Sequence, residues 1–343
     1  MTISLNDYRQ ALLKDALRLL WRQWTLLGVP GHDEDQANAT NERRIIDPES
    51  LLLITSELGR FDARLFDEAV NWLRQYGKLI NIQRLRGIQQ LHPLGNLRVL
   101  SAIASTVLEN SRLSKWRAIE ALSENQIGSE PLFLNFDGKP LPPFGKPDPN
   151  FERFGFFRGI QSLRPDATSP RVERPELLLV KLRALFGVNA RAEVIAALLS
   201  MQVAHPSALA RRIAYLPRSI QELLNEMALS GHIVTRREKG SREKYFSLRA
   251  GDWNFLITWP GAKIPQWTDW TVIFILLQDS IATLFSEKLS DASQLMVALR
   301  LREIFERHYA RLSEAGLAQH FPKAAHHSGL DFLDAFLTEL RKL

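Results

Sequence analysis

Nine prolines lie between residues 131 and 175 of this 343-residue chain, and they interrupt a pattern that is otherwise helical. Proline lacks a backbone N–H and fixes φ, so this density excludes a regular helix and favours extended or polyproline backbone. Seven phenylalanines are interleaved with the prolines: Phe133, Phe136, Phe144, Phe151, Phe154, Phe156 and Phe157. A free linker rarely carries so many aromatic side chains. We therefore predict that residues 128–174 form a Pro/Phe-rich linker, docked along a folded surface between two halves of the chain.

The composition is that of a globular protein. Hydrophobic residues make up 45% of the chain and charged residues 24%, close to the average of soluble domains. The chain has no cysteine, which excludes a disulfide scaffold, a cysteine-ligated zinc site and a cysteine nucleophile. The first eight residues lack the basic start of a signal peptide. The most apolar window, Trp270–Phe285, is too short to span a bilayer. We expect a cytoplasmic protein with no membrane partner.

The positive charge is concentrated in one segment. The whole chain has a net charge of +6, but residues 171–250 carry 14 lysines and arginines against seven acidic residues. The rest of the chain is therefore close to neutral. Such a local excess points to a unit that binds a polyanion, rather than to a protein that is basic throughout.

The N-terminal residues 1–127 are predicted to form a helical domain. Apolar spacing predicts helices over 5–27, 48–59, 63–76, 94–108 and 114–122, with Asp47 and Asp62 as N-caps. Residues 79–82 (Leu-Ile-Asn-Ile) are expected to form a short strand. Two helices followed by a strand fit a small winged-helix-like unit over residues 48–86. They fit an ordinary helical subdomain equally well, because no second wing strand is evident after residue 87.

Residues 175–250 are predicted to contain a helix-turn-helix followed by a hairpin. Helices are expected over 175–186, 191–200, 207–213 and 218–230, and strands over 232–237 and 242–248. A short helix, a turn of three or four residues, a longer helix and a basic hairpin make a helix-turn-helix with a wing. The expected fold class is mainly α with small β-hairpins, in which this winged helix-turn-helix domain is flanked by helical domains.

Residues 191–248 resemble the winged-helix domain of bacterial transcriptional regulators of the MarR/ArsR type. The resemblance is carried by PSALARRI from Pro206, LPRSIQELL from Leu216 and LSGHIV from Leu229. It implies a DNA-binding fold over about 60 residues. Pro217 and the Tyr215-Leu216 turn depart from the more common start of the second helix, which is rich in Ser and Thr.

The second helix of the pair is the candidate recognition helix. Its apolar residues are placed on one face, which leaves five polar side chains outward: Arg218, Ser219, Gln221, Glu222 and Asn225. Side chains of these types contact base edges, Arg at guanine, Gln or Asn at adenine and Glu at cytosine. Any amphipathic helix also exposes polar residues. Glu222 repels phosphate, so it must face a base edge, pair with an arginine, or count against the assignment of a recognition helix.

The hairpin is the candidate wing. Its cations are Arg236, Arg237, Lys239, Arg242 and Lys244, and they could reach phosphates or the minor groove. The alternative is a solubilising surface hairpin, since edge strands often carry Lys and Arg. Arg211 and Arg212 are expected near the DNA backbone, on the first helix of the pair.

Residues 251–343 are predicted to form an aromatic-rich helical C-terminal domain. Helices are expected over 267–289, 292–315 and 330–343. Six apolar residues of this domain have two interpretations: they form a surface for a partner or effector, or they form the interior of the domain. They are Trp267, Trp270, Leu295, Leu299, Ile304 and Phe305. A homodimer is also expected, because operators commonly have two-fold symmetry.

The sequence contains no pattern of a catalytic site. Gly138-Lys139 and Gly145-Lys146 lack the spacing of a phosphate-binding loop, and His326-His327 lack the spacing of a helical zinc site. We therefore expect a non-enzymatic protein without metal or cofactor that binds double-stranded DNA as a transcriptional regulator, in the simplest form a repressor. The alternative is a protein-interaction module, or an antitoxin-type protein that neutralises a partner protein.

Overall fold

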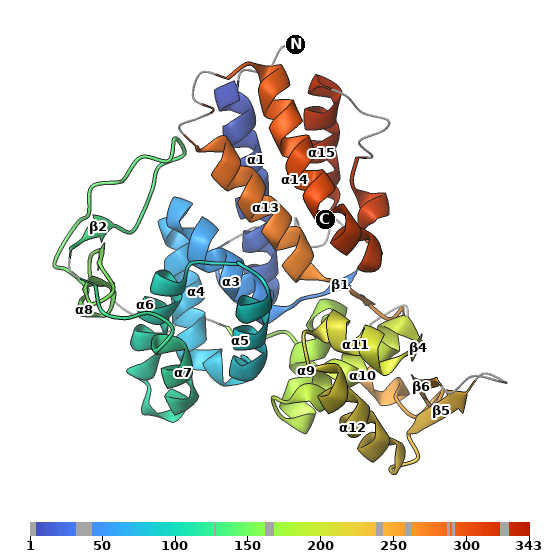
Figure 1. Cartoon of the computed structure of the whole chain (residues 1–343). Coiled ribbons are helices and arrows are strands. Elements are labelled where there is room, and N and C mark those ends of the chain that lie inside the picture. Colours follow the sequence, from blue (N-terminus) through green and yellow to red (C-terminus); the bar gives the residue numbers. More distant parts are fainter. Residues whose placement is uncertain are drawn as a thin grey trace.

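The computed structural model describes residues 5–31, 43–126, 128–161, 168–237, 243–257, 263–286, 289, 292–322 and 329–343 (Figure 1). Within these residues the fold is mainly helical, with a few small sheets. None of the described helices is both long and apolar enough to cross a membrane.

The N-terminal helices begin where side chains cap them. Their bounds are α1 (Leu5–Leu26), α3 (Pro48–Leu58), α4 (Ala63–Tyr76), α5 (Ile82–Leu91), α6 (Leu97–Leu108) and α7 (Arg117–Glu120). The Asp47 carboxylate accepts hydrogen bonds from the backbone N–H groups of Glu49 and Ser50, and Pro48 takes the first helical position. Asp62 caps α4 in the same way, through Leu65 N–H. Both caps agree with the prediction from the sequence.

The strand predicted over residues 79–82 is wrong. Residues 77–79 form a single 3-10 turn, and α5 follows at Ile82. The reason is Asn81, whose side chain accepts a hydrogen bond from Arg84 N–H at 3.1 Å and so begins a helix. Residues 46–126 are all described and contain no strand, so the winged-helix-like interpretation of residues 48–86 loses the strand on which it depended.

The Pro/Phe-rich segment packs on the N-terminal helices. It contains β2 (Glu130–Pro131), which pairs in parallel with β3 (Phe156–Phe157), and the short helix α8 (Pro149–Glu152). Phe151, Phe154 and Phe156 are fully buried, and the Phe151 ring lies 5.8 Å from the ring of Phe66 on α4. Phe144, by contrast, is 92% exposed.

Residues 175–248 form the elements that follow. They are α9 (Leu178–Phe186), α10 (Ala190–Met201), β4 (Val203–Ala204), α11 (Pro206–Ile213), α12 (Pro217–Ala228), β5 (Ile233–Arg237) and β6 (Lys244–Leu248). The strands make an antiparallel sheet in the order β4-β6-β5, with Val203 opposite Ser247 and Ile233 opposite Leu248. The strand β4 was not predicted. We call the apolar cluster under these elements the small core.

The C-terminal helices join the first helix in a bundle, at the top of Figure 1. They are α13 (Trp270–Leu284), α14 (Gln294–Glu314) and α15 (Leu330–Lys342), preceded by β7 (Gln266–Trp267), which pairs in parallel with β1 (Arg44–Ile45). Helix α1 packs on α13 and α15. The buried side chains of this bundle and of α3 to α6 form one continuous cluster, which we call the large core.

The interpretation of six C-terminal apolar residues as a partner surface is wrong for four of them. Trp270, Ile304 and Phe305 are buried in the large core, and Trp267 is buried in the small core. The Trp270 indole donates to the carbonyl of Ile45 at 2.8 Å, which holds it inside. Leu295 and Leu299 are the two that remain exposed, at 66% and 49%.

Candidate nucleic-acid interface

The turn between α11 and α12 is set by local backbone chemistry. The His205 ring accepts a hydrogen bond from Ser207 N–H, and Pro206 takes the first position of α11. Ala214 ends that helix in the left-handed region, at φ 57°. Pro217 then begins α12. Four apolar side chains, two from each helix, hold the pair on the small core: Leu209, Ile213, Ile220 and Leu224.

Of the five polar side chains predicted for the recognition helix, four are exposed and one is half-buried. Arg218, Ser219, Glu222 and Asn225 are exposed, and Gln221 is half-buried. The Arg218 Nε donates to Glu222 Oε1 at 2.9 Å. The Arg191 guanidinium on α10 holds Glu226 at 3.0 Å in the same way. Both acidic groups of α12 are therefore paired with arginines, which was one of the alternatives considered for Glu222.

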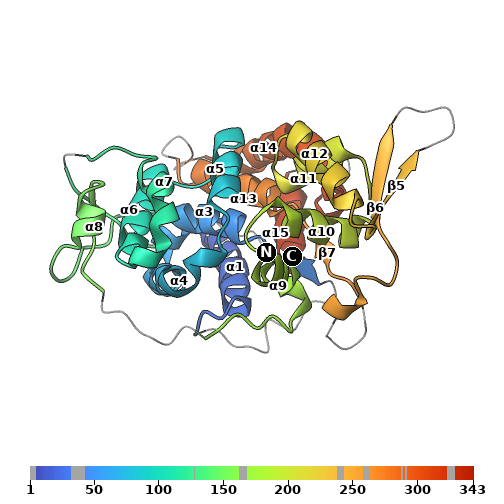
Figure 2. The same ribbon diagram turned by 90° about the horizontal axis from the view of Figure 1, so that it is seen from below.

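The hairpin extends from the body at the edge of the molecule (Figure 2). Arg236 and Arg237 are exposed on β5, and Lys244 is half-buried on β6. The register places Arg237 directly opposite Lys244. Like charges opposite each other destabilise a strand pair, so this position favours an anion that would bind both. Lys239 and Arg242 lie outside the described residues.

Arg211 is exposed and Arg212 is half-buried on α11. Their side chains border a cavity of about 520 Å³ between α11 and the bundle helices α13 and α14. The backbone carbonyl of Arg212 accepts a hydrogen bond from the Trp267 indole at 3.2 Å. The backbone of Arg212 is therefore held by a contact with β7, and its side chain is less exposed than that of Arg211.

A groove beside α12 was not predicted. It runs between α12 and α5, and its walls include Gln83, Arg86 and Gln90 from α5 and Ser219, Glu222 and Leu223 from α12. Successive residues of a helix are turned by about 100°. Ser219 and Glu222 therefore lie on the side of α12 toward α5, while Gln221 and Asn225 lie farther round the helix. The five candidate base-contacting residues are thus divided between two sides.

A buried ionic network fastens the helix-turn-helix to the N-terminal helices. Arg183 on α9 contacts Glu49 at 2.7 Å and Glu193 at 2.6 Å, with all three side chains at 0% exposure. Arg84 on α5 contacts Glu49 at 2.7 Å and Asp47 at 2.6 Å. We call these five residues the buried network.

The buried network reaches the turn between α11 and α12. Arg84 Nε donates to the carbonyl of Ile213 at 2.9 Å, and Asn81 Nδ2 donates to the Tyr215 hydroxyl at 2.7 Å. Burial alone would raise the pKa of Asp47, but the adjacent Arg84 guanidinium holds that pKa below its usual value. The sequence carries no signal for the network, because charged residues at helical spacing are usually on the surface.

Comparisons with protein-family models, with curated proteins and with solved structures found no match to this chain. In the described part of the chain, no group of three or more His, Asp or Glu side chains is placed to hold a metal ion. The His326-His327 pair lies outside that part.

Proposed function

We propose that the protein is a sequence-specific DNA-binding transcriptional regulator, in the simplest case a repressor that occludes promoter DNA. The observation that carries the proposal is the arrangement of residues 190–248: helix α10, strand β4, helices α11 and α12, then the hairpin of β5 and β6. Because β4 pairs with β6, the order is helix, strand, helix, helix, hairpin, with one three-stranded sheet. This is the order of a winged helix, whose second paired helix enters the major groove.

The charges around this unit support a division of roles. Arg236, Arg237 and Lys244 would contact phosphates, where their charge adds affinity without reading sequence. Gln221 and Asn225 would contact base edges, since they lie on the side of α12 away from the α5 groove. Arg218, which does not line that groove, would do so as well. Arg211 and Arg212, on α11, would lie near the DNA backbone. The argument that Ser219 and Glu222 contact base edges is weaker, because both residues line the groove beside α5.

The first test is a gel-shift titration on the DNA upstream of the protein's own gene. An unrelated duplex of equal length serves as competitor, at about 50 and 200 mM salt. We expect a discrete complex that weakens with salt and survives the competitor. The mass of the complex also reports whether one copy or a homodimer binds. Equal binding to both duplexes would contradict sequence-specific regulation.

Variants separate the two roles. The double variant Arg236→Ala, Arg237→Ala should weaken binding to every duplex and reduce the salt slope by about 2, one unit for each phosphate that is no longer neutralised. Gln221→Ala should instead reduce the preference between duplexes by about 1–3 kcal/mol. The matched control is Arg112→Ala, Arg117→Ala, which removes two exposed arginines far from the hairpin in the chain. Hairpin variants that bind like this control would place the DNA surface elsewhere.

A second function, binding of a partner protein as in an antitoxin-type role, is favoured by one surface feature. The Trp253 ring lies 6.3 Å from the rings of Phe186, His232 and Phe255, and Phe255 is 58% exposed. Leu229, at the end of α12, is 89% exposed. Exposed apolar groups of this kind are typical of protein-binding surfaces. A pull-down with the product of the neighbouring gene tests this function, with Phe255→Ser as the variant expected to lose the partner.

A further inference from the structure

The cavity of about 520 Å³ between α11 and the bundle has the size and the walls of a site for a small molecule. It lies where α11 and the turn after it face the start of α13 and the end of α14 (Figure 1). Much of its wall is apolar and includes Leu91, Met201 and Val272. Ligand cavities have volumes of about 300–1,000 Å³ and mostly apolar walls with a few polar groups. The polar groups of this wall therefore decide which ligand it would take.

Three arginines border this cavity, and none of them forms an ion pair with an acidic residue that the structure describes. Arg211 and Arg212 come from α11, and their side chains make no hydrogen bond or ion pair in that part of the chain. Arg311, from α14, contacts the His92 ring, with 3.4 Å between Nη1 and Nδ1. Burial and the charge of Arg311 lower the pKa of His92, so the ring is neutral at pH 7 and leaves that charge uncompensated.

Arg212 holds the group that most needs a partner. Its Nε is buried and has no hydrogen-bond acceptor among the described residues. Buried polar groups are nearly always hydrogen-bonded, and a buried donor left without an acceptor costs free energy. An anion in the cavity would supply an acceptor to this guanidinium.

The carboxylates at the cavity do not cancel the positive charge. Asp269 caps α13, its Oδ1 accepting a hydrogen bond from Val272 N–H at 3.4 Å, and burial raises the pKa of Asp269 to about 6. Glu314 is exposed and forms no ion pair with another described residue. Three guanidiniums therefore face two carboxylates, which leaves at least one positive charge in surplus.

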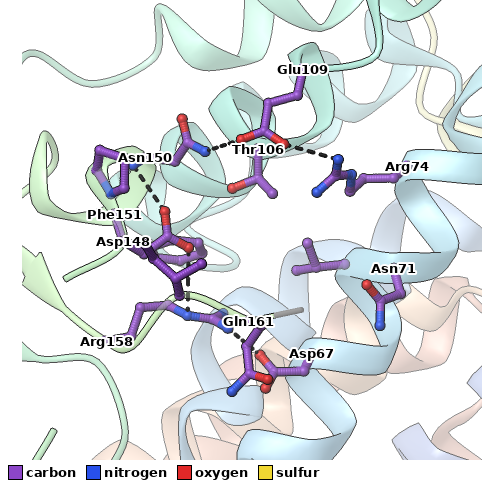
Figure 3. Close-up of a pocket in the computed structure, with 13 residues that line it drawn as sticks. Asp67, Asn71, Arg74, Thr106, Glu109, Asp148, Asn150, Phe151, Arg158 and Gln161 are labelled. Carbon is purple, nitrogen blue, oxygen red and sulfur yellow. Dashed lines mark hydrogen bonds and ion pairs between the residues drawn. The ribbon is translucent and has the colours of Figure 1, made fainter. Parts of the chain in front are cut away.

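The cavity drawn in Figure 3 differs in this respect. It is smaller, about 300 Å³, and lies between α4, the end of α6 and residues 148–161. Its two arginines have acidic partners: Arg158 contacts Asp67 at 2.7 Å, and Arg74 contacts Glu109 at 2.9 Å (Figure 3). Neither guanidinium there is left to pair with a ligand, whereas those beside α11 are.

We propose that the cavity beside α11 binds a small monocarboxylate with an apolar body. The carboxylate pairs with the three arginines, since guanidinium groups bind carboxylates through charge-assisted and often bidentate hydrogen bonds. The carbon chain packs on Met201 and Val272, so the site favours an anion with a carbon body over a bare inorganic anion. Arg211 and Arg212 are also proposed to lie near the DNA backbone. The test therefore uses the chain without DNA, and its outcome does not depend on the proposed DNA-binding function.

The test is isothermal titration of the full chain with octanoate, octanamide, octylamine and acetate. Octanamide and octylamine keep the chain length of octanoate but are neutral and cationic, and acetate keeps the charge without the chain. We expect octanoate to bind, and each of the other three to bind at least about tenfold more weakly, because each lacks the negative charge or the apolar body. No binding of octanoate would overturn the proposal, as would binding of octanamide or acetate as tight as that of octanoate.

Three variants and a control locate the binding. Arg212→Met and Arg311→Met keep a long side chain and remove its charge, so each should lose about tenfold in octanoate affinity. Glu314→Gln removes a repelling carboxylate and should bind octanoate about twofold to threefold more tightly, a gain that misfolding cannot produce. The control is Arg307→Met, which removes an exposed arginine of α14 one turn before Arg311 and outside the cavity wall. If Arg212→Met and Arg311→Met bind octanoate like the control, the carboxylate binds elsewhere and the proposal fails.

Discussion

Replacing Arg183 by Met should destabilise the protein far more than any surface substitution of the same kind. The Arg183 guanidinium is 0% exposed and donates five hydrogen bonds, to Glu49, Glu193 and the carbonyl of Leu79. Without it, the carboxylates of the buried network keep one arginine, Arg84, as their buried partner. Two negative charges would then lack compensation.

The magnitude follows from the charges left behind. Removing one partner of a buried ion pair costs about 3–5 kcal/mol, because the other charge stays buried and unpaired. Since Arg183 serves two carboxylates, we expect the upper end, about 5 kcal/mol. That is a large share of the total stability of about 5–15 kcal/mol of a typical domain. The network joins α3 and α5 to α9 and α10, so its loss should also loosen the small core from the large core.

The assay is urea unfolding, followed by circular dichroism and by tryptophan fluorescence. The matched control is Arg191→Met, which removes an arginine of α10 from an exposed pair with Glu226 and should change the stability by about 0–1 kcal/mol. The double variant Arg183→Met, Glu193→Met should be less destabilised than the sum of its single variants, because it leaves one fewer unpaired charge. Equal effects of Arg183→Met and Arg191→Met would refute the reasoning.

Two further predictions concern pH and the backbone. Burial raises the pKa of Asp269 from 3.8 to about 6, so the folded state binds this proton more tightly than the unfolded state. The stability that the group contributes is therefore fully present below about pH 4 and is lost as the pH rises through about 6. Asp269→Asn, which can still cap α13, should reduce the fall in stability between pH 4 and 7 by about 1–3 kcal/mol, measured by urea unfolding at each pH. Gly28 has φ +104°, and a Cβ there would lie 2.4 Å from the carbonyl oxygen of Thr168. Gly28→Ala should lower the stability by about 2 kcal/mol in thermal unfolding, and Gly251→Ala, also at positive φ but in open space, should lower it less.

The elements that the sequence predicted well are those whose signals are local. Asp47 with Pro48, and Asp62, define helix starts within a few residues of chain. The same kind of signal was misjudged at Asn81, because the apolar residues on both sides of it resemble a strand. The two-residue strand β4 was missed, since it exists only through its pairing with β6, some 40 residues later in the chain.

The sequence could predict which residues of α12 are at the surface of the candidate site, but not which other segments pack beside that helix. The spacing of Arg218 and Glu222 at i and i+4 already allowed the pair that the structure contains. The groove beside α5 was not predictable, because it depends on how two distant segments pack. The buried network was missed for a related reason. In the sequence, Glu49 and Arg183 look like charged residues on the solvent-exposed faces of two separate helices, and only the fold brings them together.

The packing of α1 against α15 has a consequence for synthesis on the ribosome. Tyr8 donates its hydroxyl hydrogen to the carbonyl of Leu333, across 325 residues of chain. Helix α1 emerges before α13 and α15, and it cannot bury its apolar face in the bundle until both have been made. The elements of residues 178–248 are separated by short connections and share the small core, so most of their contacts can form earlier. Helix α1 therefore reaches its final contacts long after it has been translated, and it is exposed to chaperones and proteases during that interval.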